Sequence, residues 1–433
     1  MTPSFDLQHI ISCVSGYDPN ALRVDAALAV IQASMQPVQA TERLAVRAAL
    51  GRVLAQDIIS PIDVPAHDNS AMDGYALRGA DIAAQGDTVL SVAGRGLAGH
   101  AFSGEAPAGS AVRIMTGAVM PAGCDTVVPQ EFCRVEGDQV IFPPGLVRPG
   151  DNRRLRGEDL ARGKAALPAG KVLRPADLGL MASLGMAEVS VRRKLRVAFF
   201  SSGDELRSVG QPLDPGCVYD SNRYTLWGML ERLGCEVIDL GVVADNPQAV
   251  EAALRTATEC ADVVITSGGV SVGEADYLRS TLANMGEVVF WRIAMRPGRP
   301  LAFGQLRARE NNANAQTAWL FGLPGNPVAV MVTFYAFVRP ALLHCMGASP
   351  QPQPMLRAVS AQTLRKKPGR TEYQRGLLSP LPDGRWQVSA IGNQGSGVLS
   401  SMSQAHGLIV LHHEQSTAQA GDLVDVLLFE GLV

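Results

Sequence analysis

The pattern of apolar and polar positions changes along the chain and divides it into segments of different secondary structure. Between residues 24 and 35, apolar residues recur at helical spacing and Pro37 follows, which predicts an amphipathic helix. From residue 57 to about residue 147, short β-like runs alternate with glycine and proline turns, which predicts a small, mostly β unit. The stretch "RPADLGLMASLGM" then indicates a helix that begins at a proline. Because helical character returns after it, we interpret the β unit as an insertion.

From residue 195 the pattern becomes an alternation of strands and helices. The runs "RVAFFSSG", "CEVIDLGVV" and "DVVITSGG" predict three strands, and apolar residues at helical spacing lie between them. Asn246 and Pro247 are typical of the N-cap and first turn of a helix. Continuous β-branched strands that alternate with helices favour a parallel sheet covered on both faces, with right-handed crossovers.

The last part of the chain has a different pattern. After the proline-rich "ASPQPQP", the runs "WQVSAI", "GLIVLHH" and "LVDVLLF" alternate like strands without a convincing helix, which predicts a small β barrel or sandwich. We therefore expect an α/β multidomain protein with a central doubly wound, mostly parallel sheet domain at residues 195–349. The other predicted domains are a helical or mixed N-terminal linking domain (1–56 and 148–194), an inserted β-rich domain (57–147) and a C-terminal β-barrel domain (350–433).

Composition supports this picture and narrows the possible partners. The chain has 433 residues, and roughly 150 residues per domain suggests about three domains. The formal charge of −3 excludes a general electrostatic attraction to nucleic acid or anionic membranes, so small molecules or proteins are the expected partners. Seven scattered cysteines without a C-x-x-C pair indicate buried thiols in a reducing compartment.

Two further stretches bear on location. The start "MTPSFDLQHIISC" has acidic and polar residues where a signal peptide would have a basic flank and an apolar run. The longest apolar stretch, "PVAVMVTFYAFV", is shorter than the roughly 20 residues that span a bilayer. We expect a cytoplasmic protein without a membrane span.

The candidate chemistry lies at the predicted strand ends. "SGGVSVGEAD" (residues 267–276) places three glycines and two acids directly after an apolar strand. In open parallel sheets, ligands bind outside the carboxyl ends of the strands, where glycines let backbone N–H groups approach an anion. The acids are explained if a divalent cation such as Mg²⁺ bridges carboxylates and phosphate oxygens. Asp204 and Glu205 end another strand and Asp245 a third, although N-capping explains Asp245 about as well as metal binding does.

Three arginines and a proline-containing turn come after the acidic stretches in the sequence. "WRIAMRPGRP" places Arg292, Arg296 and Arg299 near a turn, where guanidinium groups bind oxyanions, although a solvated strand end would carry the same residues. "GLPGNP" (residues 322–327) brackets a turn with two prolines; its fixed backbone suits ligand approach, and a purely structural turn is the alternative. The sequence thus predicts an anion and metal site, with structural roles left open.

These motifs occur together in a known order. "DNSAMDGYA", "IMTGAVMP", "RGED", "SSGDEL", "YDSNR", "SGGVSVGEAD", "RPGRP", "GLPGNPV", "QRG" and "GSG" follow one another along the chain. Together they closely resemble the molybdopterin molybdenumtransferase family, which includes MoeA and the gephyrin E domain, over nearly the full length. The resemblance implies a MogA-like, molybdopterin-binding sheet domain and the final step of molybdenum cofactor synthesis. In that step, molybdate is inserted into the dithiolene of adenylylated molybdopterin, and AMP is released by Mg²⁺-dependent cleavage.

The resemblance also implies which residues form the site. Its catalytic positions fall on Asp73, Thr116, Glu205, Asp245 and Asp276, the last three at the metal and pyrophosphate. The implied substrate-binding residues are Ser202, Gly203, Asp204, Asp220, Ser267, Gly268, Gly269, Ser271, Gly273, Arg292, Arg296, Arg299, Pro324, Asn326, Pro327, Arg375 and Ser396. An elongated homodimer is implied, in which the sheet domain of one subunit and the inserted β domain of the other form one site.

The chain departs from many relatives of that family, because Arg292, Arg296 and Arg299 stand where these carry lysine. Arginine keeps the charge but does not readily give up a proton, so we expect molybdate binding to survive and no lysine-specific proton transfer. Two alternatives stay open: a molybdopterin adenylyltransferase, which needs only the sheet domain, and a gephyrin-like scaffold, which has no need of the acids. Contacts with the adenylyltransferase and with acceptor molybdoenzymes are further expectations.

Overall fold

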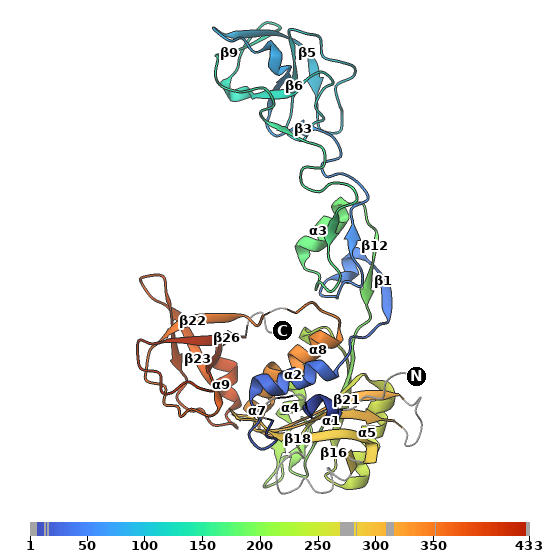
Figure 1. Ribbon diagram of the computed structural model, residues 1–433, viewed down its shortest axis with the longest axis vertical. Helices are drawn as coiled ribbons and strands as arrows, with labels where there is room; N and C mark the ends of the chain where they lie inside the picture. Colours follow the sequence, from blue (N-terminus) through green and yellow to red (C-terminus); the bar gives the residue numbers. More distant parts are fainter. Residues whose placement is uncertain are drawn as a thin grey trace. The chain divides into compact units, whose positions relative to one another are not determined.

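Two compact units divide the chain, and Figure 1 shows the elements of both. The computed structural model describes residues 7–12, 14, 17–268, 281–282, 284–308, 316–350 and 352–429. The first unit contains Met1–Glu42, Gly51–Ala55 and Val191–Val433, and the second contains Arg43–Leu50 and Gln56–Ser190. The predicted sheet domain and the predicted C-terminal domain both belong to the first unit, whereas the finer division into four domains stays a prediction.

The second unit is built on a six-stranded sheet with the order β7-β4-β6-β5-β9-β8. Its strands are β4 (Gly74–Leu77), β5 (Thr88–Gly96), β6 (Ser110–Ile114), β7 (Thr126–Pro129), β8 (Arg134–Glu136) and β9 (Gln139–Phe142). Successive side chains point to opposite faces, so Tyr75 and Leu77 join one buried apolar cluster and Ala76 joins another. The predicted mostly β unit is therefore confirmed, with apolar packing on both faces of its sheet.

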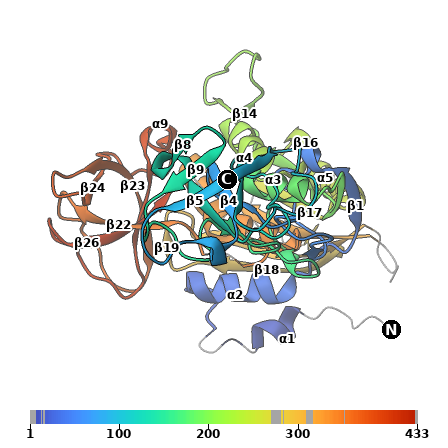
Figure 2. The same cartoon turned by 90° about the horizontal axis from the view of Figure 1, so that it is seen from above.

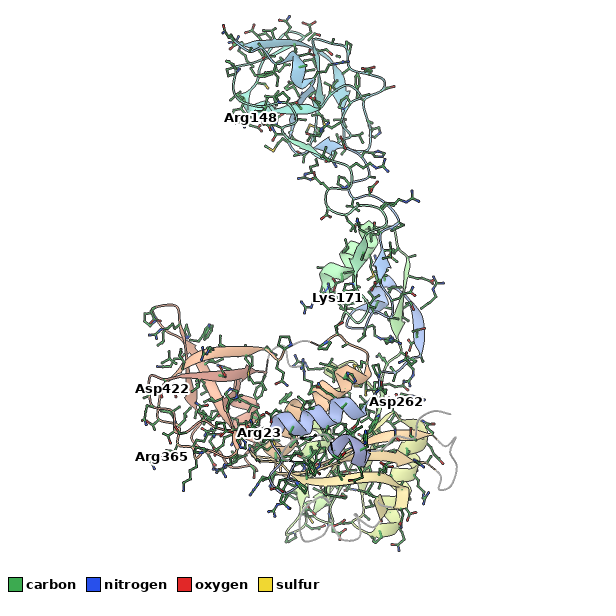
Figure 3. The ribbon with its side chains drawn as sticks, viewed as in Figure 1. Arg23, Arg148, Lys171, Asp262, Arg365 and Asp422 are labelled. Atoms are coloured by element: carbon green, nitrogen blue, oxygen red, sulfur yellow. The ribbon has the colours of Figure 1, made fainter. Side chains whose placement is uncertain are left out.

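Short elements complete the second unit and its connections. They are β1 (Thr41–Ala45), η1 (Val46–Ala49), β2 (Ile58–Ile59), β3 (Asn69–Ser70), η2 (Gly79–Asp81), η3 (Gln130–Phe132), β10 (Arg153–Arg154), β11 (Ala165–Leu167), α3 (Pro175–Ser183) and β12 (Glu188–Arg192). The predicted proline-initiated helix is α3. Asp177 accepts a hydrogen bond from the Arg174 N–H at 2.8 Å, which fixes the first turn of the helix. It also forms an ion pair at 2.6 Å with Lys171, which is labelled in Figure 3.

The first unit contains a six-stranded sheet with the order β16-β13-β17-β21-β20-β18. Its strands are β13 (Arg196–Ser202), β16 (Glu236–Val243), β17 (Val263–Ser267), β18 (Gly286–Arg292), β20 (Pro300–Arg307) and β21 (Thr317–Leu323). The pairs β16–β13, β13–β17 and β17–β21 are parallel, and β20 runs antiparallel to both of its neighbours. The predicted mostly parallel sheet is confirmed.

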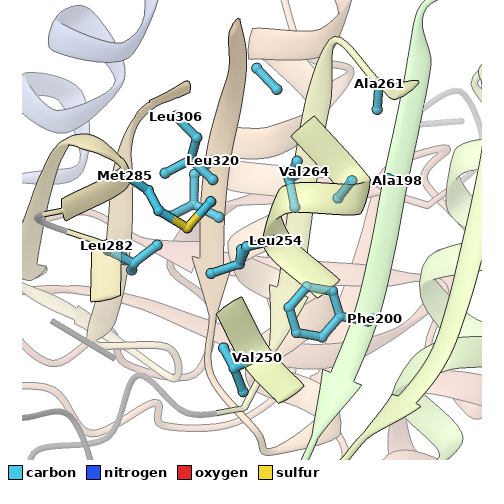
Figure 4. Close-up of a cluster of buried hydrophobic side chains, with 13 residues drawn as sticks. Ala198, Phe200, Val250, Leu254, Ala261, Val264, Leu282, Met285, Leu306 and Leu320 are labelled. Atoms are coloured by element: carbon cyan, nitrogen blue, oxygen red, sulfur yellow. The ribbon is translucent and has the colours of Figure 1, made fainter. Parts of the chain in front are cut away.

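Helices cover both faces of this sheet. The helices of the unit include α1 (Leu7–Ser12), α2 (Val24–Ser34), α4 (Ser221–Arg232) and α5 (Pro247–Cys260). Since β16 and β17 lie on opposite sides of β13, right-handed crossovers place α4 and α5 on opposite faces. Leu254 of α5 packs with Phe200 and Val264 of the sheet in a buried cluster (Figure 4). Full burial of each such side chain contributes roughly 1.5–3 kcal/mol.

One long apolar helix forms the core beside the sheet. It comprises α7 (Pro327–Thr333), the π-helical turn η4 (Phe334–Val338) and α8 (Arg339–Cys345). At 19 residues and with a mean hydropathy of 1.6, Pro327–Cys345 is long and apolar enough to cross a membrane, and 72% of it is buried inside the protein. The apolar stretch "PVAVMVTFYAFV" is therefore part of a longer helix, which continues past it to Cys345. Figure 1 shows α2 beside α8, which it contacts.

The C-terminal part of the first unit is a closed β barrel. Its strands are β22 (Met355–Ser360), β23 (Thr371–Pro380), β24 (Trp386–Ala390), β25 (Gly407–Leu411) and β26 (Leu423–Leu428). The ladder runs β23-β24-β22-β26-β25, and pairing of β25 with β23 closes the ring, as predicted. The expectation of no helix was wrong, because α9 (Leu399–Gln404) follows β24. This helix has six residues and buries only Ser401 and Met402, too few to produce a helical period. Through β19 (Met295–Arg296), which pairs with β23, the barrel connects to the sheet region.

An arm that contains the parallel strand pair β14–β15 projects from the first unit (Figure 2). The arm comprises β14 (Leu206–Arg207), β15 (Val218–Tyr219) and the turn between them. Val209 is 61% exposed, and Leu213 and Val218 are about half exposed. The arm thus presents apolar side chains to solvent rather than to the core of its own unit.

Candidate active site at the strand ends

A pocket of about 1180 Å³ lies at the carboxyl ends of the parallel strands in the first unit. Loops after β13, β16, β17 and β21 form one wall, and a barrel segment, residues 394–399, contributes to the other. The lining residues that the sequence predicted are Ser202, Gly203, Glu205, Asp220, Asp245, Gly268, Arg296, Arg299, Pro324, Asn326, Pro327 and Ser396. The position agrees with the general rule for ligand sites in open α/β sheets.

Close backbone approach explains the glycine after β17. Gly268 has a φ of +95°, and a Cβ at this position would lie 2.5 Å from the carbonyl oxygen of Ser202. Its N–H donates to the Leu323 carbonyl at 3.2 Å. A side chain would separate the ends of β13 and β17, so glycine is required for the pocket floor.

Asn222 ties three segments of the pocket together. Its amide nitrogen donates to Ser267 Oγ at 2.8 Å and to the Gly325 carbonyl at 2.6 Å. Nearby, Asp220 is the N-cap of α4 and accepts the Arg223 N–H at 3.1 Å. The start of α4, the end of β17 and the turn after β21 are thereby held in register.

Two predicted arginines enter the pocket and two do not. Arg296 and Arg299 line it, whereas Arg292 lies outside the lining at the end of β18. Arg375 is only 1% exposed and is also absent from the lining. The oxyanion contacts expected for Arg292 and Arg375 stay predictions, because neither side chain belongs to the pocket lining.

The contacts of Arg375 explain its position. Nε donates to Ser401 Oγ at 2.9 Å, and Nη2 donates to the carbonyls of Asn393 and Gly395 at 3.0 Å. Burial, and then the charge of Arg296, lower the pKa of Arg375. The guanidinium thus braces the segment that carries Ser396 into the pocket.

The acids are divided between the pocket and positions outside it. Glu205 is exposed, Asp245 is half-buried, and both line the pocket. The cap of α5 is Asn246, whose side chain accepts the Ala249 N–H at 2.9 Å, so the N-cap alternative for Asp245 was wrong. Asp204 lies outside the lining, where its carboxylate accepts the Asp245 N–H at 3.3 Å, and Ser267 is buried as the partner of Asn222.

The predicted metal set is only partly visible. Asp276, with Gly269, Ser271 and Gly273, lies outside the described residues. Within the described ranges, no group of three or more His, Cys, Asp or Glu side chains is placed to hold a metal ion. Since the predicted set of Glu205, Asp245 and Asp276 requires a residue beyond those ranges, it stays a prediction.

Asp73 and Thr116, which are far apart in sequence, meet in the second unit. Asp73 Oδ1 accepts from both the backbone N–H and the hydroxyl of Thr116, each at 2.7 Å. These two bonds lower the pKa of Asp73. The half-buried Asp73 and the exposed Thr116 thus form a hydrogen-bonded pair directly before β4 and just after β6, and their role in the pocket stays a prediction.

Sequence reasoning missed several lining residues. Asn222 and Gln394 both line the pocket. Gln394 exchanges hydrogen bonds with the backbone of Arg375 at 2.9 and 3.1 Å. Asn222 lies inside the recognised motif "YDSNR" and Gln394 directly precedes "GSG", so their proximity to predicted residues was the available signal.

Family models cover most of the chain. The MoeA N-terminal region (domain I and II) matches residues 22–185, the probable molybdopterin binding domain matches 198–344, and the MoeA C-terminal region (domain IV) matches 357–429.

Relatives and solved structures agree with these matches. A molybdopterin molybdenumtransferase of Haemophilus influenzae is 45% identical over 394 residues, which cover 91% of this chain and 95% of that protein. One from Nostoc sp. is 39% identical over 395 residues, which cover 90% of this chain and 89% of that protein. The crystal structure of the molybdopterin biosynthesis moeA protein from Pyrococcus horikoshii OT3 is similar with a TM-score of 0.81 and 27% identity, over 95% of this chain and 100% of that one.

The fold, the strand-end pocket and the three matched regions define a MoeA-type protein of molybdenum cofactor biosynthesis. With 45% identity across nine-tenths of its length, the chain belongs to the molybdopterin molybdenumtransferase family, a family of transferase enzymes.

Proposed function

We propose that this protein inserts molybdate into adenylylated molybdopterin, with Mg²⁺-dependent release of AMP, to give the molybdenum cofactor. The observation that carries the proposal is the meeting of two carboxylates, Glu205 and Asp245, with two arginines, Arg296 and Arg299, in one pocket of about 1180 Å³. A pocket of this size accommodates a ligand as large as a nucleotide joined to a pterin.

The lining residues fit the parts of this reaction. Arg296 and Arg299 provide fixed positive charge for molybdate and for the phosphate groups. Backbone groups beside Gly203 and Gly268 allow the ligand a close approach. Glu205, Asp245 and, by resemblance, Asp276 are hard oxygen donors of the kind that Mg²⁺ prefers, and Mg²⁺ would supply charge stabilisation at the pyrophosphate.

We further propose a homodimer in which Asp73 and Thr116 of one subunit complete the pocket of the other. Two features support this arrangement. The Asp73–Thr116 pair is preformed and Thr116 is exposed, and the arm of residues 206–219 exposes apolar side chains that a second subunit could cover. The expected setting is the cytoplasm, with the adenylyltransferase and acceptor molybdoenzymes as transient partners and without nucleic acid or membrane contacts.

The matches favour this function over the two alternatives. An adenylyltransferase requires only the sheet domain, whereas the family models for both MoeA terminal regions match here. A scaffold has no requirement for acids in a pocket, yet Glu205 and Asp245 line it.

Single-turnover AMP release tests the proposal. Wild-type protein is mixed with adenylylated molybdopterin, with molybdate and Mg²⁺ each present or omitted, and Asp276→Ala is compared with it. We expect release that requires both ions and is lost in the variant. No release from the wild type under any condition would refute the transferase function, and release that persists in Asp276→Ala would remove that residue from the chemistry.

A further inference from the structure

The pocket wall contains two buried oxygen atoms to which no residue of the described ranges donates a hydrogen bond. Asp220 is 3% exposed, Asn222 is 8% exposed, and both line the pocket. Asp220 Oδ1 caps α4, whereas Oδ2 is one of these two atoms. Asn222 donates through its amide nitrogen, and its Oδ1 is the other. Both atoms are hydrogen-bond acceptors, and the two residues that carry them lie at the start of α4.

Among the described residues, none donates a hydrogen bond to these two oxygen atoms. The neighbouring cation, Arg223, is engaged with Asp239, whose two carboxylate oxygens lie 2.8 and 2.7 Å from its Nε. The amide of Asn222 cannot flip, because its oxygen would then face the Gly325 carbonyl, which is also an acceptor. Buried acceptors of this kind are unfavourable unless a ligand or water satisfies them.

We propose that Asp220 Oδ2 and Asn222 Oδ1 form the subsite that recognises the pterin ring through its 2-amino and N3–H groups. The inference rests on the proposed function, which places adenylylated molybdopterin in this pocket. Two acceptors at one helix start match a ligand edge that carries two donors side by side. The phosphates and molybdate present acceptors, and the adenine edge alternates donor with acceptor, whereas the 2-amino and N3–H groups of a pterin are adjacent donors.

The test uses a variant that reverses the hydrogen-bonding character of one atom. Asp220→Asn keeps a good N-cap for α4 and places an NH₂ donor where Oδ2 now accepts. Asp214→Asn is the matched control, because Asp214 is exposed on the arm and pairs with Arg207 outside the pocket lining. Dissociation constants of the full-length proteins are measured by calorimetry for pterin and for lumazine, which carries a carbonyl in place of the 2-amino group.

We expect wild type and Asp214→Asn to bind pterin roughly 10- to 100-fold more tightly than lumazine, and Asp220→Asn to lose or invert this preference. Thermal unfolding confirms that the variant is folded. Equal binding of the two ring systems by the wild type, no binding of either, or a preference that survives in Asp220→Asn would overturn the inference.

Two further outcomes separate this inference from the proposed function. If Asp220→Asn weakens AMP binding and leaves pterin binding unchanged, the acceptor pair serves the ribose hydroxyls and the pterin assignment is wrong. If the wild type releases AMP in the molybdate-dependent assay but shows no pterin preference, the function stands and only this subsite is refuted. Pterin preference without AMP release would leave the subsite and refute the function.

Discussion

Arg375 distinguishes a residue that positions a loop from one that binds an oxyanion. Its guanidinium donates three hydrogen bonds, to Ser401 Oγ and to the carbonyls of Asn393 and Gly395. In Arg375→Lys the charge remains, but a single ammonium group can replace at most one of these bonds in the same geometry. Two bonds from a charged donor are lost in a buried place, so the variant should lose about 2–4 kcal/mol of unfolding free energy.

Tryptophan fluorescence measures this loss selectively. All four tryptophans, at positions 227, 291, 319 and 386, belong to the first unit, so urea unfolding followed by their emission reports on that unit alone. Arg299→Lys is the control, because Arg299 is an exposed lining residue whose replacement should change the unfolding free energy by less than about 0.5 kcal/mol. We also expect a higher KM for molybdate in Arg375→Lys, since the segment that carries Ser396 is no longer braced. An Arg375→Lys protein as stable as the wild type would refute the positioning role.

Three further predictions follow from single contacts. Gly268→Ala should lose about 2–4 kcal/mol of unfolding free energy in the same urea assay, because its Cβ meets the Ser202 carbonyl oxygen. Gly210→Ala is the control: its φ of +91° is similar but the space around it is open, so backbone strain alone should cost it about 1–2 kcal/mol. Equal losses would contradict the clash with Ser202. Thr116→Val should raise the pKa of Asp73, measured by carboxyl NMR titration, because it removes the hydroxyl hydrogen bond that lowers this pKa most. In the wild type, the contribution of this hydrogen bond to stability is complete above the ordinary pKa of 3.8 and disappears as the pH falls through the lowered pKa. An unchanged titration in Thr116→Val would contradict the contact. Burial raises the pKa values of Cys235 and Cys345 to about 12, so neither should react with iodoacetamide at pH 8 in the native protein, and the half-buried Cys217 should react before both. Mass spectrometry before and after unfolding checks this, and early labelling of Cys345 would contradict its burial.

The sheet was predictable because its strands are buried on both faces. Runs such as "DVVITSGG" are apolar throughout, and the cap at Asn246 with Pro247 marks where the following helix begins. The failure was α9, which is too short for a periodic signal. The sequence also did not indicate that the apolar stretch belongs to a helix that continues through a π-helical turn and past Pro340 to Cys345. Local patterns do not contain the tertiary packing that stabilises both elements.

The candidate site was predictable in its residue types but not in its geometry. Charge and glycine content after the strands indicated Glu205, Asp245 and Gly268, and the structure places all three in the pocket lining. Sequence could not reveal that Arg375 is enclosed behind the wall while Arg296 enters the pocket, because both are arginines beside strands. That difference arises from partners such as Ser401, which only the closed barrel brings near. Asn222 was missed for the same reason, since its partners come from β17 and the turn after β21.

The most direct test of the central claim is the transfer of molybdenum itself. Purified protein is incubated with adenylylated molybdopterin, ⁹⁹Mo-labelled molybdate and Mg²⁺, and the label in the isolated cofactor is counted for wild type, Asp245→Asn and Asp214→Asn. We predict label in the cofactor, in proportion to the AMP released, for wild type and for Asp214→Asn, and little or none for Asp245→Asn. Equal labelling by Asp245→Asn would contradict the assignment of the chemistry to this pocket, and an unlabelled cofactor with active wild-type protein would contradict the molybdenum transfer.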